Sequence, residues 1–388
     1  MSLDVDALRR REFPWTQPGD AVFLNAASTG PLPQRAVDVL TEWARLRATP
    51  HKLKDDFLFG TLARSRELIA KLIHARPDEI ALAGNTGYGI NLAARALPLA
   101  KGDVIVTPHR EFPANVYPWM GAAKARDLRY RLVPAAVGER VEDVLIKSLD
   151  DRDVKCMAVS WVDFLTGYRV DLEELGRACR ARGAYLVVDG IQGLGACALD
   201  LSHGLVDIFA CGAQKWLLSP WGSGFVYVRR DLIASMEPSP VSWMAPKSTD
   251  DFRHLLDFDP TWRDDARRFE FVTLPFQDFA AMNASLDLFL ELGPANVANH
   301  VASLATEIVR WGERRGGVEM ITPVDAAQRA GIVSLRPSDG QKVSDALRVA
   351  GVTHSLREGA VRLSPHAYNT SGEVRRALDV LRGASAPQ

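Results

Sequence analysis

The sequence predicts an α/β fold, with a mainly parallel sheet covered by helices on both faces and a small α+β domain at the C-terminus. From Ile80 to Val228, short apolar runs alternate with segments of helical periodicity, as in strands joined by crossover helices. From about Gly293 onward, helical segments dominate and only a few half-buried strands appear. We therefore expect a large domain over residues 31–292 and a small domain over residues 293–388.

Length and charge narrow the class of protein. The chain has 388 residues, enough for one large domain and a smaller one. Its 47 Lys and Arg residues are balanced by 48 Asp and Glu residues, which leaves no basic surplus to neutralise a nucleic-acid backbone. The N-terminus is charged and lacks the apolar core of a secretory signal, and no apolar run reaches membrane-spanning length. We expect a cytoplasmic protein with no nucleic-acid or membrane partner.

The cysteines do not form a metal-binding or disulfide pattern. Cys156, Cys179, Cys197 and Cys211 show no CxxC spacing and no histidines at ligand intervals. We therefore expect buried thiols and no metal site, with Cys211 as a candidate neighbour of the functional site because it lies four residues before Lys215.

The N-terminal part begins with a short strand at Phe23 that gives way to small residues and prolines up to Pro33. Such a segment is typical of chain that approaches a site closely instead of filling a core. Helical periodicity follows over residues 35–48 and 61–74, and the charged residues 49–59 are predicted to connect the two helices.

A glycine-rich turn follows the apolar run at residues 80–83 and opens a helix. It contains Thr86 and Gly87. Exposed amides at a helix N-terminus, a Thr hydroxyl and the helix dipole together bind phosphate. The alternative is a turn that only changes the direction of the chain.

Two later apolar runs each deliver one polar residue to the end of a predicted strand. Asp189 closes the run that starts at Ala184, and Lys215 follows the run that starts at Val206. Open α/β sheets hold their ligands at the carboxyl ends of the strands. A carboxylate and an amine there suit pyridoxal phosphate, which needs an amine for its aldehyde and an acid beside its ring nitrogen. Taken singly, Asp189 is more simply explained as a turn or helix-capping residue and Lys215 as a solvated loop charge.

The remaining elements follow from the same patterns. Further strands are predicted at residues 104–107 and from residue 156 onward, with a helix from Leu172 to Arg182. Residues 250–265 read as an irregular loop. A helix over residues 277–292 should lead into the small domain. That domain should contain a helix over residues 295–315 and strands at 332–335 and 361–364, each strand being followed by a helix. Residues 383–388 should be disordered.

Three sequence blocks resemble the class V aminotransferase family, which includes cysteine desulfurases, kynureninase and isopenicillin N epimerase. They are Val-Val-Asp-Gly-x-Gln at residues 187–192, Gly-x-Gln-Lys-Trp at 212–216 and Gly-Ser-Gly-Phe-Val-Tyr-Val at 222–228. A fourth, Arg-x-Ser followed by Tyr-Asn-Thr at residues 362–370, resembles the motif in which the family binds the substrate carboxylate. The resemblance implies the seven-stranded type of sheet found in fold type I enzymes, with pyridoxal 5'-phosphate as the cofactor.

The resemblance also assigns roles to single residues. It implies that Lys215 is catalytic and holds the cofactor aldehyde, and that residues 1–30 line the active site. The implied cofactor-binding residues are Thr86 and Gly87 at the phosphate, Phe112 stacked on the ring, Asp189 at the ring nitrogen, Gln192 at the ring hydroxyl, Gln214, and Thr273, which reaches the neighbour's phosphate in a homodimer with shared active sites. Arg362 and Asn25 are the implied substrate-binding residues, and the substrate is an amino acid.

The reaction itself is less well defined by the motifs. Desulfurases carry a nucleophilic Cys shortly before the substrate Arg, whereas residues 351–360 contain none, so we do not expect a standard cysteine desulfurase. Transamination or epimerisation at Cα is the leading interpretation, and β- or γ-elimination by a lyase such as a C–S lyase is the alternative. A non-catalytic amino acid sensor is a third hypothesis, against which the joint presence of Lys215, Asp189 and Arg362 counts. His354, Arg357 and several tryptophans either shape the substrate pocket or fill the core.

Overall fold

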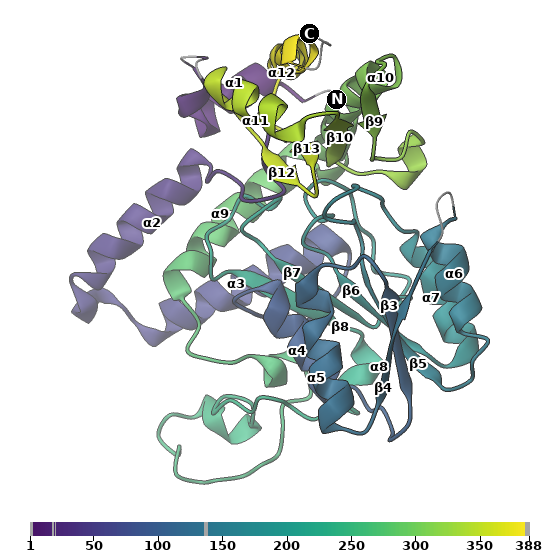
Figure 1. The fold of residues 1–388 in the computed structure, drawn as a ribbon. Helices are drawn as coiled ribbons and strands as arrows, with labels where there is room; N and C mark the ends of the chain where they lie inside the picture. Colours follow the sequence, from purple (N-terminus) through teal and green to yellow (C-terminus); the bar gives the residue numbers. More distant parts are fainter. Residues whose placement is uncertain (1–2, 18, 20, 136–138, 385–388) are drawn as a thin grey trace.

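The structure is a computed structural model that describes residues 3–17, 19, 21–135 and 139–384. Its centre is a seven-stranded sheet with the order β2-β8-β7-β6-β5-β3-β4 (Figure 1). The strands from β7 to β4 run parallel, and β8 is antiparallel to both of its neighbours. Their bounds are β2 Ile80–Leu82, β3 Val104–Pro108, β4 Arg129–Val133, β5 Val154–Ser160, β6 Tyr185–Asp189, β7 Ile208–Gly212 and β8 Gly224–Val228.

Helices cover both faces of this sheet, as predicted. Alternate residues of each strand face opposite sides, so Leu186 and Val188 belong to one apolar core and Val187 to the other. The first core lies under α3, α6 and α7, and the second under α4, α5 and α8. The bounds of these helices are α3 Asp55–Ile73, α4 Thr86–Ala96, α5 Tyr117–Ala125, α6 Val141–Ser148, α7 Leu172–Arg182 and α8 Arg230–Ile233.

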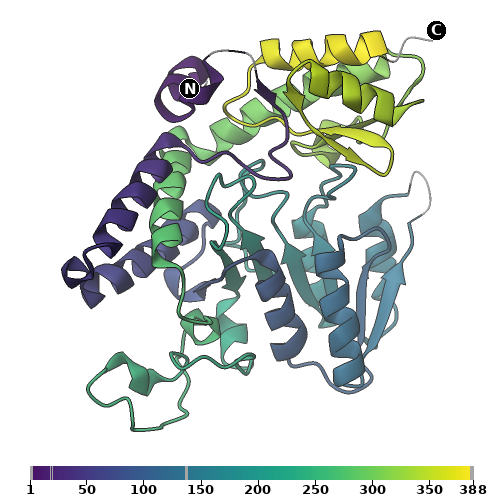
Figure 2. The same ribbon diagram turned by 60° about the vertical axis from the view of Figure 1, so that its left-hand side comes forward.

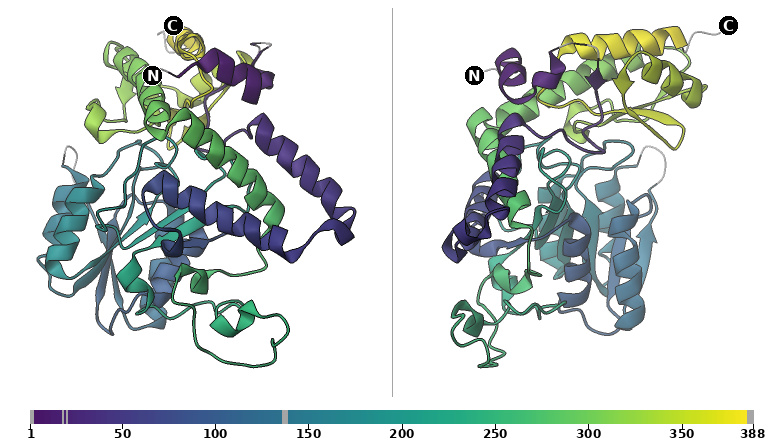
Figure 3. Two further views of the ribbon diagram at one scale, coloured as in Figure 1. Left: turned by 180° about the vertical axis from the view of Figure 1, so that it is seen from behind. Right: turned by 90° about the vertical axis from the view of Figure 1, so that its left-hand side faces the viewer.

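Three helices flank the sheet on one side, where α2 and α3 both pack against α9 (Figure 3). An ion-pair cluster joins them to the first helix, because Glu12 binds Arg35 of α2, and Arg35 also binds Glu291 of α9. The remaining bounds here are α1 Val5–Glu12, α2 Gln34–Arg47 and α9 Phe276–Leu292.

The C-terminal part is an antiparallel four-stranded sheet with the order β12-β13-β10-β9, backed by helices. Figure 2 shows it above the large sheet, beside the N-terminal residues. The strand β1 near the N-terminus pairs in parallel with β11, and Val22 and Leu24 join the apolar core of this part. The bounds are β1 Val22–Phe23, α10 Pro294–Glu313, β9 Val318–Met320, β10 Val333–Pro337, α11 Gly340–Val349, β11 Val352–Thr353, β12 Ser355–Arg357, β13 Ala360–Leu363 and α12 Ser371–Ala384.

The predicted fold class is confirmed, two local predictions need correction, and some short elements were missed. The connector predicted over residues 49–59 is wrong in its second half, because α3 begins at Asp55, where two acidic residues favour the first helical turn. Gly383 belongs to α12, while residues 385–388 of the predicted disordered tail lie outside the described residues. The short elements α5, β4 and α6 were not predicted, since β4 is an edge strand with exposed and half-buried residues and gives no apolar run.

Within the part of the chain that the structure describes, no helix is both long and apolar enough to cross a bilayer.

Candidate active site

Asp189 and Lys215 lie at the ends of neighbouring strands. Asp189 is the last residue of β6 and pairs in register with Ala210 of β7, and Lys215 follows β7 after two residues of loop. The Asp189 side chain is buried, and its Oδ1 atom accepts a hydrogen bond of 3.0 Å from the Ile191 amide. The two predicted key residues are therefore brought together.

Burial and mutual attraction set the charges of this pair. Burial raises the pKa of Asp189 to about 6, and the Ile191 amide and the Lys215 ammonium oppose the rise. Burial lowers the pKa of Lys215, an effect that Asp189 opposes and the Arg362 charge reinforces. A larger fraction of Lys215 than of a solvated lysine is therefore neutral at a given pH, and the neutral amine is the form that attacks an aldehyde or accepts a proton.

The predicted phosphate-binding residues gather around the backbone of Gly212. Thr86 is the first residue of α4, and its Oγ1 atom accepts a hydrogen bond of 2.8 Å from the Gly212 amide. A Cβ placed on Gly212 would lie 2.5 Å from Oε1 of Gln214 and 3.3 Å from Oγ1 of Thr86. Thr86 and Gly87 occupy the first turn of α4, where amides have no partner within the helix. A donor set suited to an anion is therefore present beside Lys215.

The N-terminal segment packs directly on the lysine. The Gly30 amide donates to the carbonyl of Gln214 at 2.9 Å, and a Cβ on Gly30 would lie 2.1 Å from the carbonyl oxygen of Lys215. Only glycine fits this approach. The segment therefore lies directly against the backbone of Gln214 and Lys215.

Gln192 joins two segments of the chain at this site. Its Oε1 atom accepts from the Trp216 indole at 2.9 Å, and its Nε2 atom donates to the carbonyl of Ala27 at 3.0 Å. The amide therefore ties the N-terminal segment to the residue after Lys215. One Nε2 hydrogen remains for any further acceptor.

Arg362 is a buried cation without a carboxylate partner among the described residues. It lies on β13, and its guanidinium donates to the carbonyl of Phe164 at 2.7 Å and to the hydroxyls of Ser28 at 2.9 Å and Ser355 at 3.4 Å. Its Nε atom is buried and has no hydrogen-bond partner in the structure. Burial, with the nearby Arg357 charge, lowers the pKa of Arg362 to about 10. A buried cation held only by neutral groups is suited to an anion supplied from outside.

Asn25 acts on Arg362 through hydroxyl groups. Its Oδ1 atom accepts from Ser28 at 2.9 Å and from Ser355 at 2.7 Å, and both hydroxyls also contact the Arg362 guanidinium. The N-terminal segment, β12 and β13 thus converge on one point. Ser28 and Ser355 were not predicted, because a single serine carries no pattern in the sequence.

Phe112 lies beside the lysine amine. Nζ of Lys215 is 5.8 Å from the centroid of the Phe112 ring, and the Phe164 ring packs edge-on against Phe112 with centroids 5.2 Å apart. Phe112 is 39% exposed, so one part of the ring is free to contact a ligand.

Glu111 is a feature that the sequence reading missed. Its carboxylate accepts hydrogen bonds from the amides of Ser160 at 2.7 Å and Phe112 at 2.8 Å, and from the Ser160 hydroxyl at 2.5 Å. Burial raises the pKa of Glu111 to about 7, and the charge of Asp189 adds to the rise. The end of β5 is thereby fixed to the segment that carries Phe112.

His366 was also given no role from the sequence. Its Nδ1 atom accepts from the Ala367 amide at 2.6 Å, so Nε2 carries the hydrogen and donates to the carbonyl of Trp216 at 2.9 Å. Burial lowers the pKa of His366 to about 4, which keeps the ring neutral. The ring stacks between Trp216 and Tyr368. His366 therefore fixes the backbone directly after Lys215.

Cys211 lies near the site, as the sequence allowed. All four cysteines are buried and free. Burial raises the pKa of Cys211, and the Asp189 charge adds to this effect while Lys215 opposes it.

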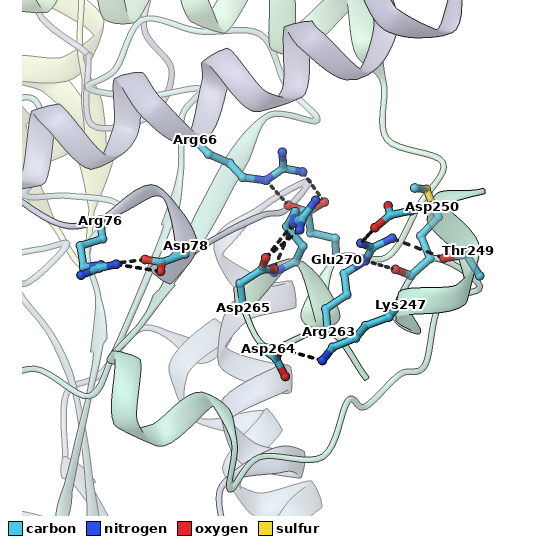
Figure 4. Close-up of polar contacts among 12 residues, drawn as sticks. Arg66, Arg76, Asp78, Lys247, Thr249, Asp250, Arg263, Asp264, Asp265 and Glu270 are labelled. Atoms are coloured by element: carbon cyan, nitrogen blue, oxygen red, sulfur yellow. Dashed lines mark hydrogen bonds and ion pairs between the residues drawn. The ribbon is translucent and has the colours of Figure 1, made fainter. Parts of the chain in front are cut away.

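Thr273 is exposed. Among the described residues, no hydrogen bond joins its side chain to Lys215, Asp189 or Thr86. Three residues earlier in the chain, Glu270 forms a bidentate ion pair with Arg66 of α3 at 2.8 and 2.7 Å, which holds this segment in place (Figure 4).

Comparison with curated proteins gives relatives of several activities. The chain is 30% identical to an isopenicillin N epimerase from Streptomyces clavuligerus, over 93% of this chain and 95% of that one. It is 28% identical to a probable cysteine desulfurase from Methanothermobacter thermautotrophicus, over 94% of each chain. It is 27% identical to an uncharacterized aminotransferase from Bacillus subtilis, YcbU, over 81% of each chain.

Solved structures share the fold. A cysteine desulfurase from Thermococcus onnurineus NA1 superposes with a TM-score of 0.86 at 21% identity, covering 99% of this chain and 98% of that one. The cystine C–S lyase C-DES superposes with a TM-score of 0.87 at 21% identity, covering 97% of this chain and 100% of that one. The profile of the family described as aminotransferase class-V matches residues 22–376. The chain therefore belongs to the class V aminotransferase family.

Proposed function

We propose that this protein is a pyridoxal-phosphate enzyme that acts at the Cα atom of an amino acid, by transamination or epimerisation. One observation carries the proposal. The buried guanidinium of Arg362 has no carboxylate partner among the described residues and lies close enough to Lys215 for its charge to lower the lysine pKa. A substrate carboxylate bound to Arg362 would place the adjacent Cα within reach of the amine.

Pyridoxal phosphate is the cofactor of the class V family, and the residues here fit it. Lys215 offers an amine for its aldehyde, buried Asp189 offers a carboxylate for its ring nitrogen, and the first turn of α4 with Gln214 offers donors for its phosphate. Phe112 offers an aromatic face for its ring. When bound, this cofactor supplies an electron-withdrawing ring that stabilises negative charge developing at Cα.

The side chains of the protein handle the proton and the orientation. Arg362 binds the α-carboxylate, and Asn25, through Ser28 and Ser355, fixes the guanidinium in the required position. The Lys215 amine, with its lowered pKa, removes the proton from Cα and returns it. The possible outcomes differ in where the proton is returned. Return to the opposite face of Cα inverts the amino acid, and return to another carbon leads to transamination.

A lyase that eliminates a β- or γ-substituent is the alternative, since it shares every step up to the removal of the α-proton. We do not propose a cysteine desulfurase of the standard type. The four cysteines are buried, burial raises the thiol pKa values, and the residues between β11 and β13 contain no cysteine. A nucleophilic thiolate needs exposure and a lowered pKa.

We also propose that the active enzyme is a homodimer in which Thr273 contributes to the partner's phosphate site. The exposed Thr273 side chain and its anchoring through Glu270 and Arg66 support this role. Mixing inactive Lys215→Ala and Thr273→Val proteins should restore activity, because one site of the mixed dimer then has both native residues. If no activity is recovered after the subunits have exchanged, the two subunits do not share their active sites.

The reaction is tested by incubating the purified holoprotein with a panel of amino acids and identifying the products. Transamination gives more than one equivalent of keto acid per site only while an acceptor keto acid is present, and epimerisation gives the opposite enantiomer. Elimination gives ammonia, a keto acid and the released β- or γ-substituent without an acceptor. Failure of Lys215 to retain the cofactor, or its retention with no turnover of any amino acid, would overturn the proposal.

A further inference from the structure

Arg357 lies on the edge strand β12, next to the strand that carries Arg362. In the β12–β13 pair, Ser355 is opposite Arg362 and Arg357 is opposite Ala360. Side chains two residues apart on a strand, and those directly opposite on its neighbour, share one face. Ser355, which touches the guanidinium of Arg362, therefore defines the face on which Arg357 also lies. Arg357 and Arg362 are diagonal neighbours, about 7–8 Å apart at the backbone and within reach of long side chains.

Arg357 has no ion-pair partner among the described residues. The hydrogen bond recorded for its guanidinium goes to the carbonyl of Leu356 at 3.1 Å, and its side chain is exposed. Arg357 is two residues from Ser355 along β12 and is followed by the turn at Glu358 and Gly359, so it lies at the rim of the site. Its positive charge reaches the pocket, since it contributes to the lowered pKa values of both Lys215 and Arg362.

The other charged groups around the pocket already have partners. Asp163 attracts Arg362, but its Oδ1 atom is occupied by the amides of Leu165 and Thr166 and by the Thr166 hydroxyl. Glu111 is bonded to Ser160, and Asp189 faces Lys215.

His354 does not add a charge to the pocket, because burial lowers the pKa of its ring, whose nitrogens contact the Val352 carbonyl and the Ser344 hydroxyl. Arg362 alone is sufficient to bind one α-carboxylate. The positive charge of Arg357 then has no negatively charged partner in the substrate.

We propose that the substrate carries a second acidic group in its side chain, and that Arg357 binds it while Arg362 binds the α-carboxylate. This inference rests on the proposed function and names its substrate class as acidic amino acids. Arg357 lies at the rim and contributes equally to binding the substrate and the transition state, so its loss raises KM and leaves kcat nearly unchanged.

The first test compares aspartate and glutamate with asparagine and glutamine, which have nearly the same shape but no side-chain charge. We expect the wild-type holoprotein to favour an acid over its amide by about tenfold or more in kcat/KM, the size of a charge-assisted hydrogen bond. Arg357→Gln should remove this preference through KM, and Arg357→Lys should retain part of it. Arg348→Gln, which removes an exposed arginine paired with Asp345 on α11, is the matched control and should change nothing.

A second measurement does not depend on turnover. Calorimetric titration of the holoprotein with glutarate and with butyrate compares a dicarboxylate with a monocarboxylate. We expect tighter binding of glutarate, weakened by salt and by Arg357→Gln.

Equal binding of glutarate and butyrate, or turnover of neutral amino acids that is as efficient as that of acidic ones and insensitive to Arg357→Gln, would overturn the inference while leaving the proposed function intact. Loss of the proposed function would show instead as absence of cofactor on Lys215 or of any turnover.

Discussion

Two groups of arginines in this molecule are built in opposite ways. Near the loop that precedes α9, arginines are paired with carboxylates (Figure 4). Arg66 binds Glu270, and Arg263 binds Asp250. At the proposed substrate-binding end of the site, by contrast, Arg362 is surrounded by carbonyl and hydroxyl groups.

The difference separates arginines whose charge is already paired within the fold from the buried arginine that we propose binds a ligand. A paired, partly buried arginine such as Arg66 fixes one segment to another. A buried arginine held by neutral groups costs stability, and its charge is compensated only when an anion binds. The two groups should therefore respond in opposite ways to removal of the charge.

The largest effect is expected at Arg66. Arg66→Met leaves Glu270 buried and without its cation, and should lower the free energy of unfolding by about 3–5 kcal/mol. Arg64→Met, on the same helix, breaks the exposed pair with Asp287 and should cost about 0–1 kcal/mol. Denaturant unfolding of both variants measures the contrast, and similar losses for the two would contradict it.

Arg362→Met should affect activity strongly and stability little, the opposite of Arg66→Met. We expect kcat/KM to fall by the equivalent of about 2–5 kcal/mol, since the substrate carboxylate loses its charged partner. The free energy of unfolding should stay the same or rise, because an uncompensated buried charge is removed. A loss of stability as large as that of Arg66→Met would show that Arg362 is structural.

A smaller effect is expected at His366, on the segment that follows Arg362. His366→Phe leaves the Trp216 carbonyl without its donor, at a cost of about 1–3 kcal/mol, and should shift the pH profile of kcat by displacing Lys215. His366→Gln should recover part of the activity. His300→Phe breaks a similar bond to the Asn369 carbonyl and is the control, expected to leave the pH profile in place.

The smallest expected effect is the pH dependence of stability that arises from the buried carboxyl groups of Asp189 and Glu111. Burial raises the pKa of Asp189 to about 6 and that of Glu111 to about 7. The folded chain thus binds these protons more tightly than the unfolded chain, so this stabilisation is present at low pH and is lost as the pH rises from about 4 through 7. In cofactor-free protein, the difference in unfolding temperature between wild type and Asp189→Asn should change over this range.

Adding the cofactor should reduce this pH dependence, because its ring nitrogen gives Asp189 a partner. A pH dependence that is the same in wild type and in Asp189→Asn would show that the carboxyl is not perturbed.

The strand-end residues were accessible from the sequence because they follow from local patterns. Short continuous apolar runs predicted β6 and β7 as buried strands, and adjacent parallel strands bring their carboxyl ends together, so Asp189 and Lys215 were expected to lie close to each other. The glycine-rich turn before α4 is equally local.

The short elements were missed for the corresponding reason. The edge strand β4 and the helices α5 and α6 are stabilised by packing on neighbours and carry weak patterns of their own.

The sequence by itself thus determined the fold class, the lysine and carboxylate pair, and the arginine of the C-terminal motif. Tertiary structure decided how these residues are held. Ser28 and Ser355 meet at Arg362 although 327 residues separate them, and Gln192 is used to fix Trp216. Side-chain contacts across such distances depend on how the N-terminal segment and the C-terminal sheet pack above the large sheet. No local periodicity records that packing, and only the folded chain shows which arginines keep a charge for a ligand.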